Sequence, residues 1–489
     1  MALLFNNNFE FNHRNSASPS ICLKAININL PNISPATFNI INTFNYGPND
    51  FKYFFKIWPN INNIVCPDVA INNVWRHIAN LWENTPNQDA TYNRKCQGLN
   101  YERTVYQRLD GIRNNNDPYT IVPMLAETNN VSILNLSRLL NMNVTDPDYR
   151  LFVFILCSFL QNPNIPQQGF DYNMARIQLA NISDITRRVI DFIGRNVTFS
   201  CIIIPVIRAP VFHTILQNLK IPAFTQNLMQ QFCGIFVNIV RGIQNLKQRN
   251  ISHNDLHSGN IFVQRRLDGT FNTYIFDFDR SYSPMLGDNP LLNRDICART
   301  CNINQCNIYD NWLDFFKILH YVLASTPRIF QLLFLGIITD SPNNILFDPF
   351  IQLMIGSDFL TSRTTNCSWY FDTNMQNQDY KNRFQVLLVN YDTVIDRLTR
   401  YGVNVARSAF SFAPPQSNNK MLNKIENIKG KSDLLNKMPS NKLKLFFDLT
   451  TGKYIDTSIK EIRPTSIKEF DDLMDRNNTR KYEMDLKRI

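Results

Sequence analysis

The chain has 489 residues, of which 44% are hydrophobic and 18% charged, and only 15 are glycine. This hydrophobic share excludes wholesale disorder, and the length indicates about two or three domains or lobes. The net charge of +10 would permit contact with nucleic acid or phosphorylated partners, but most such charge is solvated surface. The N-terminus lacks the pattern of a signal peptide, and the most apolar windows, 151–160 and 329–339, are too short to cross a bilayer. We therefore expect a soluble, intracellular protein.

The N-terminal part of the chain is predicted to be rich in β-strand, with insertions. Residues 1–30 are expected to be a polar extension. Strands are predicted at 38–44 and 51–57, joined by a turn at 46–50, and an insertion covers 59–95. A helix near 99–109, a strand at 120–125 and a largely helical stretch to about residue 192 follow. Residues 199–207 (FSCIIIPVI) are predicted to be a buried strand, because they are short, β-branched and end near proline.

The C-terminal part is predicted to be mainly helical. Apolar residues recur at spacings of three and four between Leu228 and Leu246, which predicts an amphipathic helix. The helical pattern resumes beyond residue 291 and breaks into a linker at 408–419. Cys297, Cys301 and Cys306 crowd together but lack the fourth ligand of a zinc site, so reduced thiols are expected. The Lys-rich tail from Lys420 could touch nucleic acid, although such runs are usually solvated ends.

The segment after the 228–246 helix carries the chemistry. It reads HNDLHSGN over residues 253–260, and an apolar strand, a tight turn, a second strand and Asp277-Phe278-Asp279 follow. Because a hairpin brings the outer ends of its two strands together, Asp255 and Asn260 should meet Asp277. Carboxylate and amide oxygens suit Mg²⁺, which usually arrives with substrate phosphates. A carboxylate beside a metal-bound phosphate can accept a proton from an attacking hydroxyl. The alternative is a surface turn rich in Asn and Asp.

This segment resembles the protein-kinase-like superfamily, whose catalytic loop is H-R-D-L-x-x-x-N and whose metal loop is D-F-G. The resemblance implies an α+β, bilobal fold, with a β-rich N-lobe at 31–205, a helical C-lobe at 206–407, and a linker and basic tail at 408–489. It implies ATP as phosphate donor, Mg²⁺ as cofactor and a protein hydroxyl as acceptor. Asp255, as catalytic base, and His253 are the implied catalytic residues, and Asn260 and Asp277 are the implied Mg²⁺ ligands.

The resemblance extends to the N-terminal part. Lys56 lies in FKYFFKIW, which is similar to the family's V-A-I-K strand, and Glu102 lies on an apolar face of the 99–109 helix, where a carboxylate is costly unless paired. The resemblance implies that Lys56 binds the ATP phosphates and pairs with Glu102, with Lys95 as the alternative lysine. Adenine would bind the backbone near Pro205 and Ile207.

The family's D-x-W helix start carries an Asp that steadies the catalytic loop. Asp310 fits this role better than Asp314, which stays open as the alternative.

Departures from the family pattern keep rival functions open. No glycine-rich loop precedes Lys56, and residues 31–38 (PNISPATF) occupy its expected place, which favours a non-catalytic pseudokinase or virion scaffold. Asn254 replaces the Arg that reads a phosphorylated activation loop, so no such switch is expected. His257 and the Gly259-Asn260 ending are similar to small-molecule kinases such as the aminoglycoside phosphotransferases.

Taken together, the motifs most resemble the serine/threonine kinases of large cytoplasmic DNA viruses, of the invertebrate iridescent virus type. This resemblance implies a protein of the host cytoplasm or the virion. An ATP- and Mg²⁺-dependent serine/threonine-protein kinase is the leading hypothesis.

Overall fold

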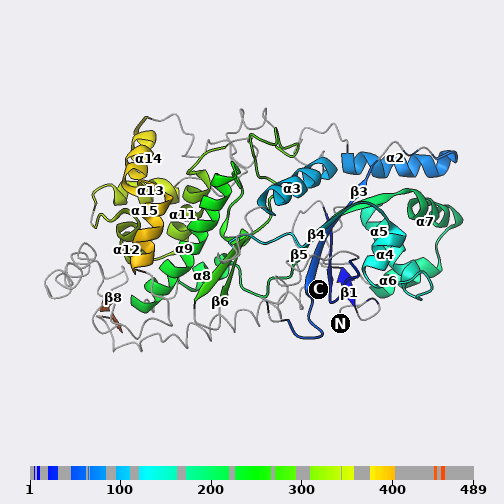
Figure 1. The fold of residues 1–489 in the computed structure, drawn as a ribbon, viewed down its shortest axis with the longest axis horizontal. Coiled ribbons are helices and arrows are strands. Elements are labelled where there is room, and N and C mark those ends of the chain that lie inside the picture. The colour runs from blue at the N-terminus through cyan, green and yellow to red at the C-terminus, as the bar shows by residue number, and fades with distance from the viewer. Residues whose placement is uncertain are drawn as a thin grey trace.

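The computed structural model combines a β-sheet region with many helices, in agreement with the predicted α+β class (Figure 1). The structure describes residues 8–11, 20–30, 46–61, 66–83, 95–110, 120–161, 172–219, 226–265, 270–292, 309–342, 344–356, 375–401, 445–448 and 453–456, together with Phe5, Phe44 and Ile64. The predicted strand at 38–44, except Phe44, lies outside these residues, as do the three crowded cysteines and most of the basic tail.

An antiparallel five-stranded sheet forms the N-terminal half, in the order β1-β2-β3-β5-β4. Its strands are β1 (Phe9–Phe11), β2 (Ile21–Ala25), β3 (Tyr53–Asn60), β4 (Ala126–Ser132) and β5 (Thr198–Pro205). The predicted strands at 51–57 and 199–207 correspond to β3 and β5. Both are buried along almost their whole length, as expected for aromatic and β-branched strands at the centre of a sheet.

The first thirty residues are not a polar extension, so this prediction is wrong. They supply β1 and β2, and the side chains of Phe9, Phe11 and Leu23 are buried. Phe11 stacks on Phe152 of α5 (Tyr149–Gln161), with ring centroids 6.0 Å apart. Side chains alternate along a strand, and Leu23 pairs with Phe55, so these aromatic residues lie on the sheet face opposite to Lys56.

The strand predicted at 120–125 is also displaced, because β4 begins at Ala126. Thr120 and Val122, earlier in the predicted strand, are bonded to a different sheet. Thr120 accepts a hydrogen bond from the amide of Ile275, and the amide of Val122 donates to the carbonyl of Ile275. The chain thus connects the C-terminal half to the N-terminal sheet at this point.

Helices cover both faces of the sheet. On the face of Lys56 lies α3 (Lys95–Asp110), where Asn100 accepts a hydrogen bond from the Trp58 indole. The opposite face carries the helical layer, seen beside the sheet in Figure 1 and composed of α4 (Ile133–Leu139), α5, α6 (Tyr172–Ala180) and α7 (Asp184–Asn196). The segment treated as an insertion contains the end of β3 and α2 (Val69–Glu83), which packs on α3, α5 and α7.

The C-terminal half is mainly helical, as predicted. Its helices are α8 (Phe212–Asn218), α9 (Gln226–Gln248), α11 (Leu313–Ser325), α12 (Arg328–Thr339), α13 (Phe347–Gly356), α14 (Met375–Leu388) and α15 (Tyr391–Tyr401). The predicted hairpin is present as β6 (Ile261–Arg265) and β7 (Phe271–Ile275), and a second hairpin joins β8 (Leu445–Asp448) to β9 (Lys453–Asp456).

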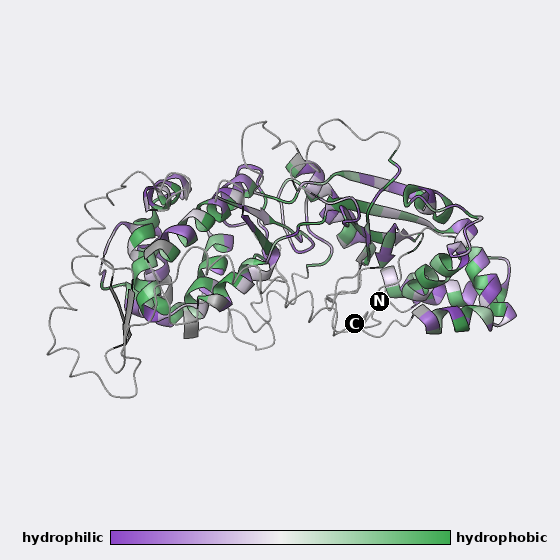
Figure 2. Ribbon diagram, turned by 90° about the horizontal axis from the view of Figure 1, so that it is seen from below, coloured by the Kyte–Doolittle hydropathy of each residue, from purple (hydrophilic) through white to green (hydrophobic). Residues whose placement is uncertain are grey.

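The apolar face of α9, predicted from its periodicity, packs on α15 and β7. Phe232 and Phe236 on this helix meet Phe334 of α12 edge to face, with ring centroids 5.2 and 5.0 Å apart. Hydrophobic residues are prominent at both ends of the molecule (Figure 2). In the described part of the chain, no helix has the length and apolar character needed to cross a membrane.

Candidate active site

Lys56 is the centre of a buried charge cluster. Its Nζ lies 2.7 Å from Oε1 of Glu102 and 2.6 Å from Oδ1 of Asp277. Glu102 is fully buried and Asp277 is partly exposed. Burial opposes a charge on Lys56, but Asp277 and Glu102 outweigh it and hold its pKa well above the usual range. Lys56 therefore carries a positive charge, and its pairing with Glu102, which the sequence predicted, is present.

Asp277 reaches this cluster because the chain turns sharply after β7. Asp277 has a left-handed φ of 71°, a conformation that costs a residue other than glycine about 1–2 kcal/mol. Such conformations persist where surrounding contacts enforce them and concentrate at functional sites. Here the enforcing contacts include the ion pair with Lys56.

An aromatic column fixes the residue that follows. The Phe278 ring lies between the rings of Tyr106 on α3 and His253, with centroid separations of 5.1 and 5.0 Å. Tyr106 lies one helical turn after Glu102 and is buried. The column thus joins α3 to the loop 253–260 through the segment that carries Asp277.

The loop 253–260 is anchored by Asp314, not by Asp310. The Asp314 carboxylate accepts hydrogen bonds from the backbone amides of His253 and Asn254, each at 2.9 Å, and from Lys247 Nζ at 2.9 Å. Burial opposes ionisation of Asp314, but Lys247 and His253 outweigh it, and its pKa is lowered.

The preference for Asp310 was wrong, because its side chain binds backbone amides at the start of α11 and not the loop 253–260. Asp310 Oδ1 accepts hydrogen bonds from the amides of Trp312 and Leu313 and so orders the turn that leads into α11.

His253 was expected to be catalytic, and the structure gives it a different place. Its side chain is fully buried, and Nε2 lies 3.0 Å from the carbonyl oxygen of Phe276. The acceptor is a carbonyl, so Nε2 carries the proton. A ring enclosed in this way cannot touch a substrate, and His253 is a positioning residue between the loop and the strand end before Asp277.

Asp255 and Asn260 lie at the same end of the hairpin as Asp277. Asn260 precedes β6 and Asp277 follows β7, and the amide of Phe276 donates to the Asn260 carbonyl oxygen at 3.1 Å. Asn260 Nδ2 donates to the Asp255 carbonyl oxygen at 3.0 Å, which orders the loop between them. The backbone thus brings Asp255, Asn260 and Asp277 to one end of the hairpin, and the convergence of their side-chain oxygens on a shared ion stays a prediction.

Lys317 was missed by the sequence analysis. This buried lysine of α11 donates to the Asn254 carbonyl at 2.8 Å and to Asp255 Oδ1 at 3.1 Å. Burial opposes ionisation of Asp255, but Lys317 and His257 outweigh it, and the pKa of the Asp255 carboxyl is lowered. Asp255 is thus a carboxylate at neutral pH. The sequence could have indicated Lys317, because it lies one turn after Asp314 and so on the same face of a predicted helix.

Pro205 and Ile207 lie where β5 leaves the sheet. The amide of Val206 between them donates to the Lys52 carbonyl at 2.9 Å, and its carbonyl accepts from the Tyr46 hydroxyl at 2.6 Å. The Ile207 amide has no hydrogen-bond partner within the described part of the chain. At the hairpin, the Phe262 and Phe276 rings are stacked with centroids 4.4 Å apart, forming an apolar surface beside Asp277.

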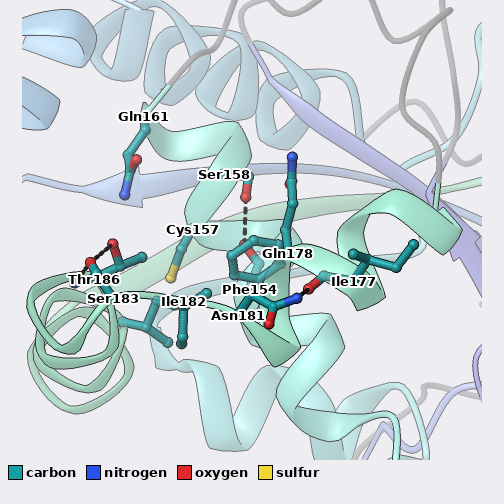
Figure 3. A pocket seen from close by; sticks show the side chains of 11 residues that line it. Phe154, Cys157, Ser158, Gln161, Ile177, Gln178, Asn181, Ile182, Ser183 and Thr186 are labelled. Carbon is teal, nitrogen blue, oxygen red and sulfur yellow. Dashed lines mark hydrogen bonds between the residues drawn. The ribbon is translucent and has the colours of Figure 1, made fainter.

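A pocket in the helical layer lies away from these residues (Figure 3). It has a volume of about 540 Å³ and is lined by residues of α5, α6 and α7 and the turn between the last two. Its lining contains no charged side chain. Cys157 in this lining is fully buried, and burial raises the pKa of its thiol. The pocket therefore offers no charged acid or base.

The donor set at the hairpin end fits Mg²⁺ accompanied by phosphate. Asn260 and Asp277 supply an amide oxygen and a carboxylate, which are hard ligands, and a magnesium ion takes its remaining ligands from water and substrate. No group of three or more His, Cys, Asp or Glu side chains among the described residues is arranged to hold a metal ion by itself.

Comparison of this chain with models of known protein families and with curated proteins finds no match.

Proposed function

We propose that this protein is an ATP- and Mg²⁺-dependent phosphotransferase with a bilobal, protein-kinase-like fold, which transfers the γ-phosphate of ATP to serine or threonine hydroxyls of proteins. The observation that carries the proposal is the contact of Lys56 with both Glu102 and Asp277, beside the strand end that holds Asp255 and Asn260. A cation, a metal-binding pair and a separate carboxylate are the groups that phosphoryl transfer requires.

Lys56 is suited to bind the nucleotide phosphates. Because Glu102 is fully buried and held on α3, it fixes the position of the lysine Nζ, and less entropy is lost when phosphate binds. The Ile207 amide would donate a hydrogen bond to the adenine of ATP, and the stacked Phe262 and Phe276 rings would contact the face of the adenine ring. When Mg²⁺ is bound, it neutralises negative charge on the phosphates, and Asn260 and Asp277 would hold it.

Asp255 is suited to orient the acceptor hydroxyl. The buried Lys317, 3.1 Å from Asp255 Oδ1, favours the ionised form, so Asp255 can accept a hydrogen bond from that hydroxyl at neutral pH. A carboxylate of lowered pKa is a weak base, and its main contribution is orientation while the proton leaves late. This matches a reaction in which positioning and electrostatics supply most of the rate.

The test is transfer of phosphate from γ-labelled ATP to a general protein substrate in the presence of Mg²⁺. We expect Asp255→Asn to lower kcat by about 10²–10⁴-fold, while the thermal shift caused by Mg²⁺ and ATP is retained. The matched control is Asp396→Asn, which removes an exposed carboxylate of α15 and should leave the rate unchanged. Transfer at the parental rate by Asp255→Asn would refute the proposed role.

The acceptor class is tested in the same assay. His257 accepts a hydrogen bond from the Gly259 amide at 3.0 Å and lies one residue beyond Leu256 in the loop. Because His257 and the Gly259-Asn260 ending resemble small-molecule kinases, aminoglycosides and other small alcohols are the second set of acceptors to be tested. If these alcohols are labelled and protein is not, the acceptor is a small molecule and not a protein. Absence of any nucleotide-dependent thermal shift would favour a non-catalytic scaffold.

A further inference from the structure

Helix α3 is bonded to the segment that follows Asp279, through Tyr101. The Tyr101 hydroxyl accepts a hydrogen bond from the Ser283 amide at 2.9 Å and donates to the Gly287 carbonyl at 3.2 Å. Both directions of hydrogen bonding of the phenol are therefore used, and the side chain is buried. Tyr101 immediately precedes Glu102, so a shift of Tyr101 along or around the helix also shifts the partner of Lys56.

The segment 281–292, here called the brace, is itself held by backbone hydrogen bonds and by the side chain of Asn289. Ser252 and Tyr282 exchange two backbone hydrogen bonds, at 2.9 and 2.8 Å, which join the brace to the chain just before His253. The fully buried Asn289 donates to the carbonyls of Asp279 and Ser281, each at 2.8 Å, and accepts from the Leu291 amide.

The brace also packs directly on the α3 backbone. A Cβ at Gly98 would lie 2.1 Å from Cγ of Leu291, so the absence of a side chain at this helical position allows the contact. Gly98 and Tyr101 are three residues apart and lie on one face of α3. The brace thus holds the helix at two adjacent points, one apolar and one polar.

We propose that Tyr101 is a positioning residue which, by binding the brace, sets Glu102 against Lys56. This inference rests on the proposed phosphotransferase function. The two hydrogen bonds of the Tyr101 hydroxyl and the contact of Gly98 with Leu291 are the contacts that hold α3 on the brace.

The first test uses Tyr101→Phe in the full chain. Removing the hydroxyl leaves the Ser283 amide and the Gly287 carbonyl without this partner, so amide hydrogen exchange in peptides covering 281–292 should become about tenfold faster. The kcat for phosphate transfer should fall about tenfold, with KM for the protein acceptor within twofold of its parental value. Tyr391→Phe is the control, because it also removes a hydroxyl bonded to a backbone carbonyl, that of Asn311, but far from α3.

The second test is the comparison of the two variants. Exchange and kcat of Tyr101→Phe equal to those of the Tyr391→Phe control would overturn the positioning role. Failure of the proposed function is distinguishable, because the parental chain would then transfer no phosphate while the exchange measurement would still report on the brace.

Discussion

Replacing Asp314 by Asn should strongly destabilise the protein, although the two side chains have the same shape. The carboxylate accepts from two backbone amides and from Lys247, and it is fully buried. An amide group offers one oxygen and turns an N–H₂ toward at least one of these donors. Lys247 also loses the carboxylate that compensates its buried charge. Removing one partner of a buried ion pair costs about 3–5 kcal/mol, and we expect a loss of this size in the free energy of unfolding.

Urea unfolding followed by tryptophan fluorescence measures this loss, and Asp310→Asn is the matched control. Asp310 accepts hydrogen bonds from two amides at the start of α11 through one side-chain oxygen, which Asn also supplies, so the control should change stability by less than about 0.5 kcal/mol. The pKa of Asp314 is lowered in the folded state, so its stabilising effect is full above its unfolded pKa of about 3.9 and is lost as the pH falls toward the folded value. The difference between the parent and Asp314→Asn should therefore shrink in acid. A loss below about 1 kcal/mol at neutral pH, or an equal loss in Asp310→Asn, would refute the anchor assigned to Asp314.

Two further predictions concern α3 and its neighbours. Lys56→Met should lower the rate of phosphate transfer by about 10²–10³-fold and destabilise the fold, because Glu102 loses its cation. Adding Glu102→Gln should restore much of the melting temperature but none of the rate. Recovery of the rate in the double variant would contradict the role of Lys56. Gly98→Ala should lower the free energy of unfolding by about 1–3 kcal/mol, because its new Cβ clashes with Leu291. Gly194→Ala in α7, where no atom lies within 4 Å of the new Cβ, should raise it by about 0.5–1 kcal/mol. Thermal denaturation of both variants is the measurement, and equal stability of the two would show that the Leu291 contact is absent.

Elements with a strong local pattern could be predicted from sequence alone. The periodicity of α9 and the β-branched run of β5 each determine their structure within a short window, and β6 and β7 pair as the predicted hairpin. Because the hairpin pairs residues close in sequence, the position of Asp255, Asn260 and Asp277 at one end of it also followed from sequence.

Elements that depend on distant partners could not be predicted in this way. β1 has only three residues, and the burial of its Phe11 comes from Phe152 on a helix far along the chain. β4 reads AETNNVS and has no apolar run, so it forms by pairing with β5 rather than by its own pattern. Asp310 and Asp314 lie one turn apart at the same helix start, and only the three-dimensional position of Lys247 distinguishes them.

The aromatic contact between β1 and the helical layer has a practical consequence. β1 is an edge strand of the sheet, and Phe152 rests on Phe9 and Phe11 from above. Proteolysis within the first twenty residues would uncover this phenylalanine and the free side of β2 together. An unpaired edge beside an exposed aromatic group is a template for association between chains. Solubility during purification therefore depends on keeping a segment whose composition suggests that it is dispensable.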